Sequence, residues 1–253
     1  MRVLVTNDDG VEAPGIHALT AAIVAAGHDV FVVAPAGERS GSGAAIGRLH
    51  RSGPMTCTTV EWPDLPGVPV HSVDVPPAAT VYAGVLGAFG PPPDVVASGI
   101  NPGMNYGHLA LHSGTVGAAL TALTLGVPAV AVSIGWSEHP EWITAGTYAA
   151  AALDWITTGP PRVVNLNVPD LPLAEVRGVS GAQPMAFSER WSADATSGEL
   201  RMEFVGRAEE PPPGSDLAAA LAGYVAVTVF DGLAVGDATE AASALAQARS
   251  TST

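Results

Sequence analysis

Lysine is absent from this chain of 253 residues, and all ten of its basic residues are arginine. The absence excludes a Walker A phosphate-binding loop, a Schiff-base enzyme and a kinase that depends on a lysine. A single cysteine, Cys57, likewise excludes an internal disulfide framework and a metal site built from cysteines. A phosphate group would therefore have to be bound without lysine, and a metal ion without cysteine.

Long hydrophobic runs are also absent. Hydrophobic residues make up 47% of the chain, but they are largely alanine and valine, and no apolar run reaches the roughly 18 residues that a membrane-spanning helix needs. A signal peptide requires a continuous apolar stretch near the N-terminus, and the charged residues Arg2, Asp8 and Asp9 break such a stretch here. We therefore expect a cytoplasmic protein that does not bind membranes.

The charge of the chain is strongly acidic, at −14. This disfavours binding to a nucleic-acid polymer, whose phosphate backbone is bound by lysine and arginine side chains that displace counterions. A free nucleotide remains compatible with the charge, because a metal ion can neutralise its phosphate locally. The expected partner is therefore a small molecule.

The pattern of apolar segments predicts an α/β fold. Strands are expected at residues 3–5, 30–34, 94–97, 129–133 and 163–168, and helices at residues 14–26 and 115–125. The first strand, helix and strand form a βαβ unit within about 35 residues. The continued alternation predicts a Rossmann-like, doubly wound and mostly parallel sheet over residues 1–170.

The C-terminal part of the chain, residues 171–253, has a different pattern. Residues 171–213 show weak periodicity and end in a run of three prolines, which we interpret as a β-hairpin-like arm. Residues 224–230 alternate as a returning strand, and the tail after Ala238 is expected to be a helix or disordered. We expect the core and this C-terminal part to form a single functional domain.

Two adjacent carboxylates, Asp8 and Asp9, end the first predicted strand and precede Gly10. Ligands of open α/β sheets bind at the carboxyl ends of the strands, and hard oxygen atoms are the ligands that Mg²⁺ and Mn²⁺ prefer. Neighbouring acids at a buried strand end repel each other unless a cation lies between them. The alternative is a plain turn, since Asp-Gly is common in turns.

Three further polar loops, at residues 38–43, 98–107 and 112–117, follow predicted strands or open a helix. Ser40 and Asn101 could complete an oxygen shell around a metal ion, although either could equally be a turn residue. Ser113 is a good helix N-cap, and Gly114 would let the backbone approach a ligand. Unpaired N–H groups at the start of a helix bind phosphate without lysine, although such a sequence is also typical of a simple cap.

Several ordered motifs give the chain a family resemblance. They are Thr6–Gly10 with Ala13–Gly15, Val33–Pro35 with Arg39–Gly41, Ser98–Asn101 with Gly103 and Asn105, Ser113–Ala118, Asn165–Pro169 and Gly223–Thr228. On these motifs the chain resembles the SurE family of survival-protein 5′/3′-nucleotidases along most of its length. The resemblance implies a Rossmann-like core whose C-terminal arm is exchanged between subunits of a homodimer or homotetramer.

The resemblance also implies the site residues. One divalent metal ion per subunit, Mg²⁺ or Mn²⁺, would be bound by Asp8, Asp9, Ser40 and Asn101. The phosphate of the substrate would be bound by Asn105, Ser113, Gly114 and Thr115. The expected catalytic residues are the two carboxylates Asp8 and Asp9, of which the one less engaged by the metal would orient or deprotonate the attacking water.

We therefore predict a metal-dependent phosphomonoesterase that hydrolyses nucleoside 5′/3′-monophosphates. Two alternatives stay open: a phosphatase specialised for another small phosphate ester, because His108 stands where the family usually has an acidic residue, and a noncatalytic nucleotide-binding regulatory protein. A haloacid-dehalogenase-type phosphatase is excluded by Gly10, which occupies the position of its second aspartate, and by the missing lysine. A dinucleotide oxidoreductase is excluded because no G-x-G-x-x-G follows the first strand.

Overall fold

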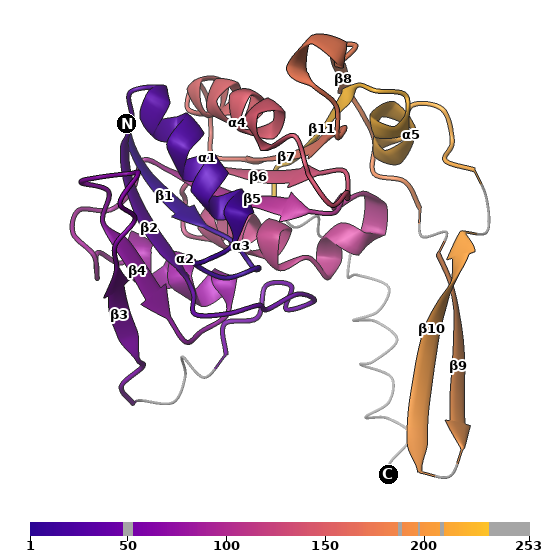
Figure 1. Ribbon diagram of the computed structural model, residues 1–253, viewed down its shortest axis with the longest axis horizontal. Helices are drawn as coiled ribbons and strands as arrows, with labels where there is room; N and C mark the ends of the chain where they lie inside the picture. The colour runs from indigo at the N-terminus through magenta and orange to yellow at the C-terminus, as the bar shows by residue number, and fades with distance from the viewer. Residues whose placement is uncertain (48–52, 187–188, 197, 208–209, 233–253) are drawn as a thin grey trace, which may run out of the picture.

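The computed structural model describes residues 1–47, 53–186, 189–196, 198–207 and 210–232. Its central feature is a nine-stranded sheet with the strand order β3-β4-β2-β1-β5-β6-β7-β11-β8 (Figure 1). The strands are β1 (Arg2–Thr6), β2 (Asp29–Pro35), β3 (Cys57–Val60), β4 (Val70–Val73), β5 (Val95–Pro102), β6 (Ala129–Ile134), β7 (Val163–Val168), β8 (Val179–Gly181) and β11 (Val225–Phe230). The tail predicted after Ala238 lies outside the described residues.

Neighbouring strands of this sheet are parallel except at two places. β3 runs antiparallel to β4, and β11 runs antiparallel to β7. The central strands are rich in valine and alanine and are buried along almost their whole length, as a sheet covered on both faces requires. The predicted α/β class with a mostly parallel sheet is confirmed.

Helices cover both faces of the sheet. They are α1 (Pro14–Ala25), α2 (Pro77–Val85), α3 (Gly114–Thr124), α4 (Trp142–Ile156) and α5 (Asp216–Leu221), with 3₁₀ turns η1 (Gly107–Leu111) and η2 (Leu173–Glu175). Val3 and Val5 of β1 pack with apolar residues of α1 and α4, whereas Leu4 between them packs with those of α2 and α3. Alternate residues of one strand therefore serve two core layers, which makes the sheet doubly wound. Within the described part of the chain, no helix has the length and apolar character needed to cross a membrane.

Some helices and strands differ from those predicted from the sequence, either in length or because they were not predicted. The strand expected at residues 94–97 continues to Pro102, because Asn101 and Pro102 pair with Ser133 and Ile134 of β6 after a break in register. The loop expected at residue 98 therefore begins only after Pro102. Elements β3, β4, α2 and α4 were not predicted; the two strands have only four residues each, too few to show a clear period.

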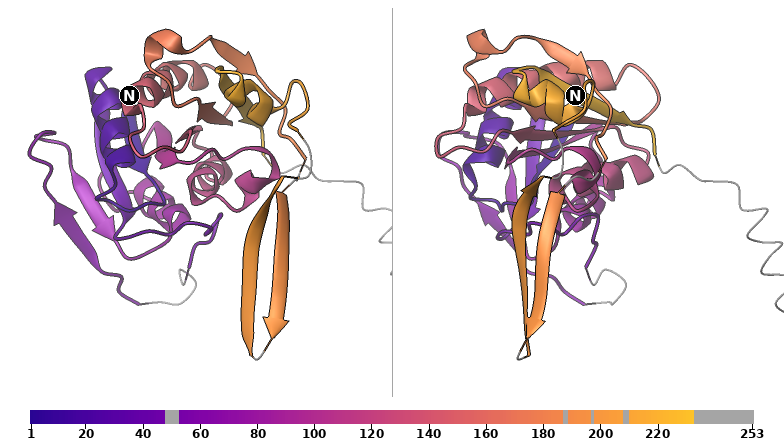
Figure 2. Two further views of the ribbon diagram at one scale, coloured as in Figure 1. Left: turned by 45° about the vertical axis from the view of Figure 1, so that its right-hand side comes forward. Right: turned by 90° about the vertical axis from the view of Figure 1, so that its right-hand side faces the viewer.

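A hairpin is present within the arm predicted at residues 171–213, but it is shorter than expected, because β8 of that range pairs with β11 in the main sheet. Strands β9 (Glu189–Thr196) and β10 (Glu199–Arg207) form a separate antiparallel pair, which projects away from the rest of the molecule in all three views (Figures 1 and 2). The ring of Trp191 packs edge-on against that of Phe204 across the pair, at 5.6 Å between centroids. Two-stranded hairpins are marginally stable in isolation, and exchange of this arm between subunits stays a prediction.

Self-association should depend on the apolar side chains of the arm. Trp191 and Phe204 are 51% and 54% exposed, so the Trp191→Ser, Phe204→Ser double variant should shift the protein towards the monomer at micromolar concentration. Multi-angle light scattering on the full chain measures the change. Leu86→Ser is the control, since Leu86 is 76% exposed on the core and not on the arm; a wild-type protein that is strictly monomeric would refute this prediction.

Candidate active site

The polar loops predicted from the sequence meet at the carboxyl ends of the central strands. The backbone N–H of Arg39, after β2, donates to the carbonyl oxygen of Asp8, after β1, at 2.6 Å. The N–H of Gly43 donates to the carbonyl oxygen of His112, just before α3, at 3.1 Å. A Cβ atom on Gly117 of α3 would lie 2.2 Å from the carbonyl oxygen of Gly43, so the loop after β2 rests directly on α3.

Asp8 lies at the N-terminus of α3 and is only 4% exposed. Its Oδ1 accepts a hydrogen bond from the Thr115 hydroxyl at 2.6 Å, and its Oδ2 accepts one from the Gly114 N–H at 3.1 Å. Ser113 caps the same helix by accepting from the N–H of Val116. Thr115 and Gly114, which we expected at the phosphate, thus hold the first carboxylate in this structure.

Glycine is required at position 114 by the closeness of this contact. A Cβ atom there would lie 2.7 Å from the Cβ of Asp8 and equally close to the Ser42 hydroxyl oxygen. That hydroxyl is buried, and among the described residues it has no hydrogen-bond partner. Sequence analysis placed Ser42 in a polar loop without assigning it to the site, because only the fold brings it to Asp8.

Asp9 is the less engaged of the two carboxylates. Its Oδ2 is buried and has no hydrogen-bond partner within the described part of the chain. Burial, and then the negative charges of Asp8 and Glu38, raise the pKa of Asp9 to about 7. Burial also raises the pKa of Asp8, although the hydrogen bonds from Thr115 and Gly114 oppose the shift. Among the residues that the structure describes, no cation forms an ion pair with either carboxylate, and an uncompensated negative pair is the environment that a metal ion fits.

The side chains around this pair favour a cation bound by oxygen atoms. Arg39 lies next to the site, but its guanidinium pairs with Asp74. The Ser40 hydroxyl donates to Glu38 Oε1 at 2.9 Å, and Asn101 uses its Nδ2 to donate to the carbonyl oxygen of Gly103 at 2.6 Å, so its Oδ1 is the atom suited to a cation. The described residues contain no cluster of three or more His, Cys, Asp or Glu side chains that would hold a metal. Hydroxyl and amide oxygens would therefore have to complete the shell.

Asn105 is held by residues that sequence analysis did not assign to the site. Its side-chain Nδ2 donates to Ser133 Oγ at 2.8 Å, and its backbone contacts Asn165 and Asn167 of β7. The sequence signal was present, because two asparagines interrupt an otherwise apolar strand. Their partner lies about 60 residues away and is not recognisable without the fold.

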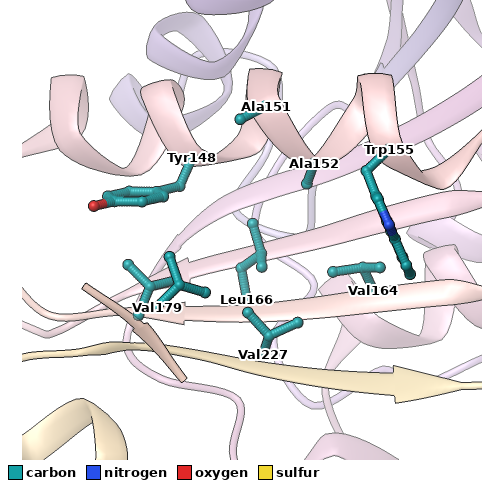
Figure 3. A pocket seen from close by; sticks show the side chains of 9 residues that line it. Tyr148, Ala151, Ala152, Trp155, Val164, Leu166, Val179 and Val227 are labelled. Carbon is teal, nitrogen blue, oxygen red and sulfur yellow. The ribbon is translucent and has the colours of Figure 1, made fainter. Parts of the chain in front are cut away.

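A second concave feature, an apolar groove, lies apart from this site. It has a volume of about 250 Å³ and lies beside α4 and strands β7, β8 and β11, with Tyr148, Trp155 and Val227 in its wall (Figure 3). Neither of the two adjacent carboxylates lines it. Its apolar lining offers no ligand for a metal or phosphate, so the candidate active site is the one around Asp8 and Asp9.

The chain matches the family described as survival protein SurE over residues 3–190. The chain belongs to the SurE family. It is 35% identical to a 5′-nucleotidase SurE of Synechococcus over 90% of both chains, and 37% identical to a 5′/3′-nucleotidase SurE of Serratia proteamaculans over 90% of this chain and 89% of that one. The SurE crystal structure from Aquifex aeolicus superposes with a TM-score of 0.80 at 26% identity, covering 97% of this chain and all of that one.

Gly114→Ala should disturb both the geometry and the stability of this SurE site. The new methyl group would lie 2.7 Å from the Cβ of Asp8, so it should displace Asp8, lower Mn²⁺ affinity about tenfold or more and lower the free energy of unfolding by about 1–3 kcal/mol through overpacking. Calorimetry and thermal unfolding measure the two effects. Gly181→Ala, whose added methyl group meets nothing within 4 Å, should change neither; unchanged Mn²⁺ affinity in Gly114→Ala would contradict the assignment.

The raised pKa of Asp9 predicts how the metal-free protein responds to pH. The unfolded carboxyl titrates near 3.8 and the folded one near 7, so folding favours the protonated form, and the resulting stability is lost as pH rises through about 7. Asp9→Asn should therefore raise the melting temperature more at about pH 8 than at about pH 5, by about 2–4 °C for each 1 kcal/mol relieved.

The control for this measurement is Asp231→Asn, because Asp231 follows β11, whose end pairs with the start of β7 at the opposite edge of the sheet. It should leave the melting temperature nearly unchanged at both pH values. An equal effect of Asp9→Asn at both pH values would show that its carboxylate is not destabilised in the folded chain.

Proposed function

We propose that this SurE protein is a divalent-metal-dependent phosphomonoesterase that hydrolyses nucleoside 5′- or 3′-monophosphates to nucleoside and inorganic phosphate. The observation that carries the proposal is the carboxylate pair that follows β1. Asp8 is bonded to the N-terminus of α3, and Asp9 has a buried oxygen with no hydrogen-bond partner among the described residues. The relatives named 5′-nucleotidase and 5′/3′-nucleotidase support the same class, a phosphoric monoester hydrolase.

The residues present fit one Mg²⁺ or Mn²⁺ ion per subunit. Asp8 and Asp9 would hold it together with the oxygens of Ser40 and Asn101, and the orphaned Asp9 Oδ2 is the atom that most needs a cation. When bound, the ion would supply positive charge that polarises the phosphoryl group and activates water. In a chain without lysine, a metal and a helix N-terminus are the available substitutes for lysine at a phosphate.

The two carboxylates have different roles in this proposal. Asp8 is fixed by two hydrogen bonds from α3, so it is suited to a rigid ligand. Asp9 is held by fewer hydrogen bonds than Asp8, so one of its oxygens could contact the metal while the other orients the attacking water. Asn105 and the turn at residues 113–115 remain the proposed phosphate side. The Gly114 N–H donates to Asp8 and the Val116 N–H to Ser113, so the positive end of the α3 dipole would stabilise charge on the phosphoryl oxygens.

A phosphatase specialised for another small ester is the second candidate. His108 is exposed in η1, between Asn105 and Ser113, the two ends of the proposed phosphate side. A cationic or neutral side chain at this place, where relatives of the family usually have an acid, would change which leaving group is accepted. A substrate panel that includes sugar phosphates separates this candidate from a nucleotidase.

Metal removal should abolish turnover. Phosphate release from nucleoside monophosphates should be lost in EDTA and return with Mn²⁺ or Mg²⁺ in preference to Ca²⁺, since the ligands are hard oxygens in a small site. Asp8→Asn and Asp9→Asn should each lower turnover about 100-fold or more at saturating metal. The control variant Asp231→Asn should keep full activity. A metal-stripped protein that hydrolyses substrate at the wild-type rate would contradict the proposal.

A further inference from the structure

Two buried asparagines interrupt strand β7. Asn165 is 1% exposed and Asn167 is 0% exposed, in the segment Val163–Val168. Val164 and Leu166, which alternate with them along the strand, face the groove under α4 (Figure 3). The two amides therefore point to the opposite face, where α3 and α5 contact β7. Burying an amide costs free energy unless it is hydrogen-bonded. A valine or leucine at the same position would be buried without this desolvation cost.

Both amides hold the backbone of a single residue, Asn105. Asn167 accepts from the Asn105 N–H at 2.7 Å and donates through Nδ2 to the Asn105 carbonyl oxygen at 3.1 Å. Asn165 donates to the same carbonyl oxygen at 2.8 Å. The paired bonds of Asn167 resemble those of a β-ladder, so a side chain fixes the backbone of Asn105 as a neighbouring strand would.

The side chain of Asn105 is fixed from the next strand. Its Nδ2 donates to the hydroxyl of Ser133, which is fully buried in β6. Ser133 is in register with Asn101 of β5 on one side and with Asn167 of β7 on the other. Asn101, Ser133 and Asn167 therefore form a row across three strands, which joins a proposed metal ligand to the support of a proposed phosphate ligand.

One atom of the other asparagine, Asn165, argues against a purely structural role. Asn165 Oδ1 is buried without a hydrogen-bond partner among the described residues, which costs stability and gives no contact in return. Buried unsatisfied groups are few in native structures and call for an explanation. Within the described part of the chain, the Asn165 side chain makes its hydrogen bond to Asn105 alone, and this points to the placement of Asn105 as its use.

We propose that Asn165 and Asn167 are positioning residues that set Asn105 at the correct place to bind the phosphate group of the substrate. The inference rests on the proposed function for the role of Asn105. Neither asparagine touches the substrate; both act through the backbone of Asn105, and Ser133 sets the direction of its side chain. Displacing a ligand group by about 1 Å is sufficient to lose one to two orders of magnitude in an enzyme.

The test uses Asn167→Ala and Asn165→Leu in the full chain. Asn165→Leu keeps the number and branching of the side-chain heavy atoms and removes the unpartnered oxygen, and thermal unfolding checks that the variant folds. Both variants should weaken the binding of inorganic phosphate by about tenfold, as measured by calorimetric titration at saturating Mn²⁺. The Mn²⁺ dissociation constant should change less than about twofold. Thr228→Val is the control, because Thr228 is buried opposite Asn165 in β11 and contacts Ala182 instead of Asn105.

A double-mutant cycle identifies the route of the effect. If the asparagines act through Asn105, adding Asn167→Ala to Asn105→Ala should weaken phosphate binding little further. Additive losses, unchanged phosphate affinity in a folded Asn165→Leu protein, or equal weakening of Mn²⁺ and phosphate would overturn the inference. Wild-type protein that binds phosphate but hydrolyses no ester would reject the proposed function alone, whereas wild-type protein that binds no phosphate would reject both.

Discussion

The contact between the Asp8 carboxylate and the N-terminus of α3 is the constraint on which the rest of the site depends. A carboxylate buried at the end of a central strand needs donors, and the Gly114 N–H and the Thr115 hydroxyl supply them. This closeness admits only glycine at position 114. It also brings the loop after β2 against α3, so that residues from three separate segments share one small volume.

Negative charge is in excess in this volume. The helix N-terminus and two hydrogen bonds offset the charge of Asp8, whereas Asp9 has a raised pKa and a buried oxygen without a hydrogen-bond partner among the described residues. Arg39 is nearby but its guanidinium pairs with Asp74 and so does not neutralise the two carboxylates. Such a site stays costly until a cation binds, and the cost is tolerated in a nucleotidase because the same cation is needed for the chemistry.

The two sides of the site come from different parts of the sheet. The carboxylates follow β1, whereas Asn101, Ser133 and Asn167 form a row across β5, β6 and β7. A rigid parallel sheet holds the two sides in a fixed relation, which is what in-line attack on a phosphoryl group requires. Asp216, buried at the start of α5, adds a link from the N–H of Gly107 to that of Met185, near the base of the arm.

Patterns local in sequence determined the α/β class, the strand ending in Asp8 and Asp9, and the helix capped by Ser113, because each is encoded within a few neighbouring residues. The convergence of these loops was also predictable, since parallel strands place their carboxyl ends at one edge. Only the tertiary structure decided that Thr115 donates to Asp8 and that Asn165 and Asn167 hold Asn105. Those partners lie 60 to 107 positions apart, and a hydrogen bond between distant residues leaves no periodic or local signal; its partner is chosen by strand register and helix packing.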